Sequence, residues 1–67
     1  MNGLTAKKIA KTMKQKQKEV RRGFSNEIEV IEHFGGYLSA LRDMKLITQP
    51  EQSSFMAEFT KSLLENF

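Results

Sequence analysis

The sequence predicts a small all-α protein, in which a basic N-terminal helix precedes a C-terminal αα-hairpin. Apolar residues recur at spacings of three and four along three consecutive segments, which is the period of an amphipathic helix. Glycine or proline falls at Gly3, Gly23 and Pro50, close to where these segments begin or end. A chain of 67 residues has room for one domain of this kind.

The first predicted helix runs from about Thr5 to Arg22, with Thr5 as its N-cap. Leu4 is expected to pack on Ile9 as a hydrophobic staple, and Gly23 is expected to end the helix. At 100° per residue, one face carries the apolar residues Ala6, Ile9, Ala10, Met13, Val20 and Phe24, interrupted by Gln17. The adjoining face carries six basic residues: Lys7, Lys11, Lys14, Lys18, Arg21 and Arg22.

The second predicted helix runs from about Glu27 to Lys45, and Asn26 and Glu29 have the spacing of a capping box. Its apolar face comprises Val30, Ile31, Phe34, Tyr37, Leu38, Leu41 and Met44, and its polar face comprises Glu29, Glu32, Ser39 and Asp43. The phase continues across Gly35-Gly36, which predicts one helix with both glycines on the polar face. Each glycine costs about 1 kcal/mol relative to alanine. Either the helix breaks there, or another group approaches that face closely.

The third predicted helix runs from about Gln49 to Asn66. Thr48 and Glu51 have the spacing of a second capping box, and Pro50 is tolerated in a first helical turn. Its apolar face comprises Phe55, Met56, Phe59, Leu63 and Phe67. The short connection between the second and third segments predicts that they form the αα-hairpin.

The small size of the chain predicts self-association. A chain of this length buries only about 60% of its unfolded surface, and without cysteine no disulfide compensates. We therefore divide the chain into a basic helix or arm, residues 1–25, and a hairpin core that also dimerises, residues 26–67. The expected homodimer interface comprises Phe34, Tyr37, Leu38, Leu41, Phe55, Phe59 and Leu63.

Charge is distributed unevenly along the chain. Residues 1–25 carry eight basic side chains against one acidic, a net charge of +7, whereas residues 26–67 carry a net charge of −4. This split predicts a polyanionic partner for the first helix. The leading hypothesis is a non-enzymatic regulatory protein whose six basic residues contact the phosphates of DNA or RNA. Lysine dominates and no aromatic residue is interleaved, so base discrimination and base stacking are not expected.

Four alternatives use the same basic amphipathic helix. As a protein inhibitor or adaptor, the chain would dock this helix on an acidic surface of a larger protein. The basic arm would otherwise lie on the acidic part of its own dimer, form a plain solvated face, or bind a membrane surface. A helix-turn-helix is disfavoured because the exposed face of the third segment carries Glu58, Lys61 and Glu65.

The residues of this chain predict neither a catalytic site nor a metal-binding site. His33 is the one histidine, with Glu29 one turn before it, whereas a metal site needs three or four ligands. Neither a phosphate-binding glycine loop nor a nucleophile elbow is present, so we expect no catalytic site and no cofactor. The longest apolar run is three residues, Phe55 to Ala57, which predicts no membrane span and a cytoplasmic protein.

Overall fold

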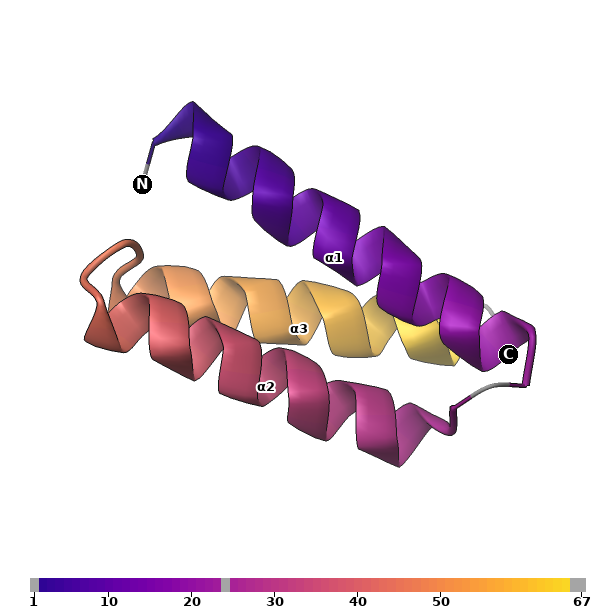
Figure 1. Ribbon diagram of the computed structural model, residues 1–67. Coiled ribbons are helices and arrows are strands. Elements are labelled where there is room, and N and C mark those ends of the chain that lie inside the picture. Colours follow the sequence, from indigo (N-terminus) through magenta and orange to yellow (C-terminus); the bar gives the residue numbers. More distant parts are fainter. Residues whose placement is uncertain (1, 24, 66–67) are drawn as a thin grey trace.

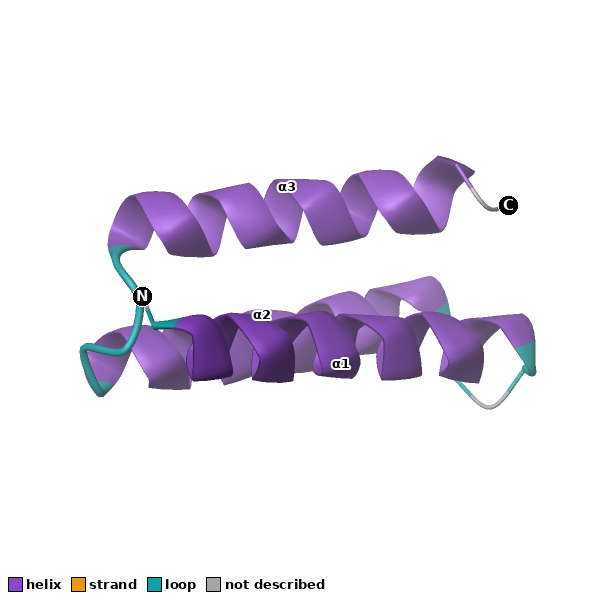
Figure 2. Ribbon diagram, turned by 90° about the horizontal axis from the view of Figure 1, so that it is seen from above, coloured by secondary structure: helices purple, strands orange, loops and turns teal. Residues whose placement is uncertain are grey.

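The computed structural model describes residues 2–23 and 25–65, which form a three-helix bundle (Figure 1). Helix α1 spans Gly3–Arg21, α2 spans Glu27–Asp43 and α3 spans Gln49–Glu65. Helices α2 and α3 run antiparallel as the predicted hairpin, and α1 packs chiefly on α2. Seen from above, α1 lies over α2 while α3 lies to one side (Figure 2). The predicted small all-α fold is confirmed.

The core draws side chains from all three helices. Ile9 of α1, Phe34 and Leu38 of α2, and Phe59 of α3 are fully buried, and Leu63 is nearly so. The rings of Phe34 and Phe59 lie 4.5 Å apart between centroids with a tilt of 45°, which is a favourable geometry for an aromatic pair. Helix α1 is therefore folded against the hairpin in the single chain.

Helix α1 begins earlier than the sequence predicted. Asn2 is its N-cap, and the Asn2 side-chain oxygen accepts a 2.8 Å hydrogen bond from the Thr5 backbone N–H. The assignment of Thr5 as N-cap is therefore wrong: Thr5 lies inside the first turn and is buried. The staple between Leu4 and Ile9 is also wrong, because the earlier start leaves Leu4 65% exposed while Ile9 enters the core.

Helix α2 continues without a break through Gly35 and Gly36, as predicted. The two glycines nevertheless face different surroundings. A Cβ atom added to Gly35 would lie 3.8 Å from the Met56 methyl carbon, so Gly35 faces α3 and the prediction that it lies on the polar face is wrong. Gly36 is exposed, and a Cβ there would meet nothing within 4 Å.

Capping side chains hold the N-terminal ends of α2 and α3, at the residues that the sequence predicted. Thr48 and Glu51 form a reciprocal box: the Thr48 N–H donates to Glu51 Oε1 at 2.8 Å, and the Glu51 N–H donates to Thr48 Oγ1 at 3.3 Å. The hydrogen bond from the Thr48 backbone lowers the pKa of Glu51. At the start of α2, Asn26 Oδ1 accepts a 2.8 Å bond from the Glu29 N–H. These local bonds orient the two helices of the hairpin.

Helix α2 ends with a residue in the left-handed backbone conformation, and in this chain that residue is a lysine. Lys45 has a φ of +61°, its N–H donates to the Arg42 carbonyl, and the Leu46 N–H donates to the Leu41 carbonyl. This pair of bonds is a Schellman motif, which ends α2 at Asp43 rather than at Lys45. At the end of α1 the corresponding position is Gly23, with a φ of +78°.

We expect Gly36→Ala and Gly35→Ala each to raise the free energy of unfolding by about 1 kcal/mol. Both positions are helical, and the structure has space for a methyl group at each. Urea unfolding followed by circular dichroism measures the change. A loss of stability in Gly36→Ala would contradict an unbroken helix at this point.

We expect Lys45→Gly to stabilise the protein by about 1 kcal/mol, because glycine adopts a positive φ without the steric cost that lysine incurs. The matched change Gly23→Ala should destabilise by a similar amount, since it introduces that cost at the end of α1. Thermal unfolding of both variants tests the pair. If both variants have the thermal midpoint of the wild-type protein, neither position is held in the left-handed conformation.

Candidate nucleic-acid interface

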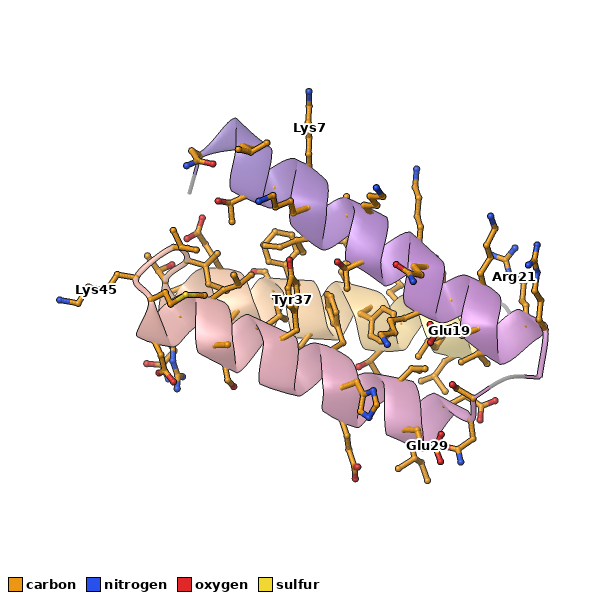
Figure 3. The ribbon with its side chains drawn as sticks, in the orientation of Figure 1. Lys7, Glu19, Arg21, Glu29, Tyr37 and Lys45 are labelled. Atoms are coloured by element: carbon orange, nitrogen blue, oxygen red, sulfur yellow. The ribbon has the colours of Figure 1, made fainter. Side chains whose placement is uncertain are left out.

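Six basic side chains form one exposed surface, here called the basic stripe. Five of them project from α1 at alternating spacings of four and three residues, and the sixth belongs to its C-cap residue. Because this alternation keeps residues on one side of a helix, the stripe is nearly straight and extends about 21 Å. Lys7 and Arg21, near its two ends, point away from α2 and α3 (Figure 3). The basic stripe comprises Lys7, Lys11, Lys14, Lys18, Arg21 and Arg22, all exposed.

The basic stripe lies opposite the core, rather than beside it as predicted. The buried residues of α1 are Thr5, Ile9, Met13 and Val20. Lys18 follows Ile9 by nine residues, which places the two half a turn out of phase at 100° per residue. Ala6 and Ala10, predicted to be apolar-face residues, are half-buried and exposed respectively. The stripe is therefore the most outward part of α1.

The charges of the basic stripe have no acidic partner among residues 2–23 and 25–65. The ion pairs found there join Lys16 to Glu19 at 3.5 Å and Lys61 to Glu65 at 3.8 Å, and neither involves a stripe residue. Within these residues, the six cations thus lie on one side of the bundle without an acidic partner. An anion that binds them would displace water and counterions, without having to break an internal salt bridge.

The outer surface of the stripe is slightly hollowed at its centre. Lys11, Lys14, Gln15 and Lys18 line an open, shallow depression. Gln15 was not among the predicted contact residues, because nothing in its local sequence distinguishes it from other exposed polar side chains. Its amide adds a donor and an acceptor to a depression that three lysines also line.

The residues predicted as a dimer interface lie in or against the core of the single chain. Five of them are buried, namely Phe34, Leu38, Leu41, Phe59 and Leu63. Tyr37 and Phe55 are half-buried and pack against the same core. Ile9, Met13 and Val20 of α1 belong to the same core. A dimer formed through these side chains would require the bundle to open.

Metal-binding clusters and membrane-spanning helices are absent from the part of the chain that the structure describes. No group of three or more His, Asp or Glu side chains is arranged there to hold a metal ion, and His33 is exposed. None of the helices in these ranges is long and apolar enough to span a membrane. No family model matches the chain, and comparisons with curated proteins and with solved structures find no match.

We expect added salt to stabilise the protein. Neighbouring stripe residues such as Lys7 and Lys11, or Lys14 and Lys18, are like charges one turn apart, and each such pair costs about 0.2–0.5 kcal/mol. Raising NaCl from 10 mM to 0.5 M screens this repulsion, so the thermal midpoint should rise. In Lys14→Gln the rise should be smaller, because fewer like-charge pairs remain. A thermal midpoint that falls as salt is added would contradict repulsion among the unpaired cations of the stripe.

Proposed function

We propose that the protein is a non-enzymatic regulatory protein that binds DNA or RNA through phosphate contacts made by the basic stripe. The observation that carries the proposal is the position of the six cations: all are exposed, none is ion-paired among the described residues, and they share the side of α1 opposite the core. A row of cations of this kind is complementary to the regularly spaced charges of a phosphate backbone.

The packing of α1 supports this proposal because it prepares the stripe for binding. Ile9, Met13 and Val20 anchor the helix on α2 and α3 in the free chain. The entropy of ordering the helix is therefore lost during folding and does not weaken the association. A disordered basic arm of the same composition would have to bear that cost on contact.

Dimensions and chemistry indicate the kind of contact. The stripe is about 21 Å long, and an α-helix with its side chains is about as wide as the major groove of a duplex. Lysine ammonium groups act as point charges on phosphates and discriminate little between bases. We therefore expect affinity that depends strongly on salt and weakly on sequence.

The test is fluorescence anisotropy with a labelled DNA duplex and with labelled single-stranded RNA, at several salt concentrations. Four to six contacts to duplex DNA would give a slope of log affinity against log salt of about −4 to −5. The wild-type protein should bind, and the triple variant Lys11→Glu, Lys14→Glu, Lys18→Glu should not. This variant reverses the charge at the centre of the stripe.

A matched control separates the stripe from net charge. Arg42, Lys45 and Lys61 are the three basic residues outside residues 1–25, and all three are exposed. Changing them to glutamate alters the net charge by the same amount, so this variant should keep most of the affinity. Equal loss in both variants would contradict a specific stripe. No binding by wild-type protein at low salt would favour the alternative, an acidic surface on a larger protein partner.

A further inference from the structure

The outer side of α2 carries a second charged surface, of opposite sign. Glu29, Glu32 and Asp43 are exposed there, and Gly36 and Ala40 lie between them. These five residues, here called the acidic face, occupy the side of α2 opposite its buried residues, which are Val30, Phe34, Leu38 and Leu41. Within the described residues, none of the three carboxylates forms an ion pair.

The middle of the acidic face is flat, and the fold of the single chain does not explain why. Gly36 lies inside a continuous helix, where glycine is less stable than alanine. A Cβ there would meet nothing within 4 Å, so no neighbour in this chain requires its absence. Gly36 and Ala40 together leave space for another helix to approach the backbone of α2 between the carboxylates.

The basic stripe matches the acidic face in length and is opposite to it in sign, with six cations on one surface and three carboxylates on the other. Glu29 and Asp43 are fourteen residues apart, as are Lys7 and Arg21, so both charged rows extend about 21 Å. The two surfaces point to different sides of the bundle: Lys7 and Arg21 lie on the outer side of α1, and Glu29 lies on the side of α2 turned away from α1 (Figure 3). A single chain therefore cannot bring its own stripe onto its own acidic face.

We propose that the acidic face binds the basic stripe of a second copy of this chain. The contact joins two different surfaces, so it is head-to-tail and leaves a free stripe at one end of each assembly. It is built from exposed charges, so it is weak and sensitive to salt. The same stripe would bind either a second copy or a polyanion, but not both. Self-association does not depend on nucleic-acid binding, and it is tested without nucleic acid.

The experiment is sedimentation equilibrium of the full chain at 10–500 µM, in 20 mM and in 300 mM NaCl. We expect the average mass to rise with concentration at low salt and to return to that of a monomer at high salt. Glu29→Lys with Glu32→Lys should weaken association by about tenfold or more, as should Lys11→Glu with Lys14→Glu.

Mixing these two double variants provides the decisive measurement. The unchanged basic stripe of the first variant meets the unchanged acidic face of the second, so one complementary pair of surfaces is restored. We therefore expect the mixture to associate although each variant alone does not. The control, Glu58→Lys with Glu65→Lys, makes the same charge change on exposed residues of α3 and should still associate.

Gly36 gives an independent readout. Gly36→Gln should stabilise the monomer by raising helix propensity, yet weaken association by filling the flat centre of the acidic face. Gly35→Ala stabilises the same helix on the side that faces Met56, so its association should be unchanged. A wild-type protein that stays monomeric at 500 µM and low salt would overturn the proposal. So would a failure of the mixture to associate, or association that strengthens with salt.

Discussion

The contact between Phe34 and Phe59 is the interaction on which the rest of the structure depends. Both side chains are fully buried, and their rings meet at 4.5 Å where α2 and α3 pack together. Leu38 and Leu63 belong to the same buried cluster, as does Ile9 of α1. Because an amphipathic helix exposes whatever lies opposite its buried residues, this core also decides which charges of α1 and α2 face outward.

Two helices of this bundle display charge of opposite sign without neutralising each other. The buried residues of α1 and α2 turn both helices inward, so the basic stripe and the acidic face are directed away from the core and from each other. Burial of these charges would cost more free energy than their pairing returns, which keeps them at the surface. The result is a protein with exposed positive charge on α1 and exposed negative charge on α2.

At several positions this chain has a residue that makes the folded protein less stable than another residue would. Lys45 adopts a conformation that glycine favours, and Gly36 occupies a helical position that alanine favours. Gln52 is a third example: its side-chain N–H donates to Ser39 Oγ at 3.0 Å, while its buried Oε1 atom has no hydrogen-bond partner among the residues that the structure describes. Natural chains retain such features where stability is sufficient without them. Of these three residues, Gly36 is the one that lies among the exposed carboxylates of α2.

The sequence by itself determined the number of helices, the hairpin, the caps at Asn26 and Thr48, and the exposed position of the six basic residues. These follow from periodicity and from hydrogen bonds within one turn, which do not depend on distant residues. Tertiary structure decided which arc of α1 is buried, that Gly35 faces α3, and that the predicted dimer residues form the core of one chain. An apolar arc shows that a helix has a buried side, but the exact direction of that side is chosen by the shape of the helices it packs against.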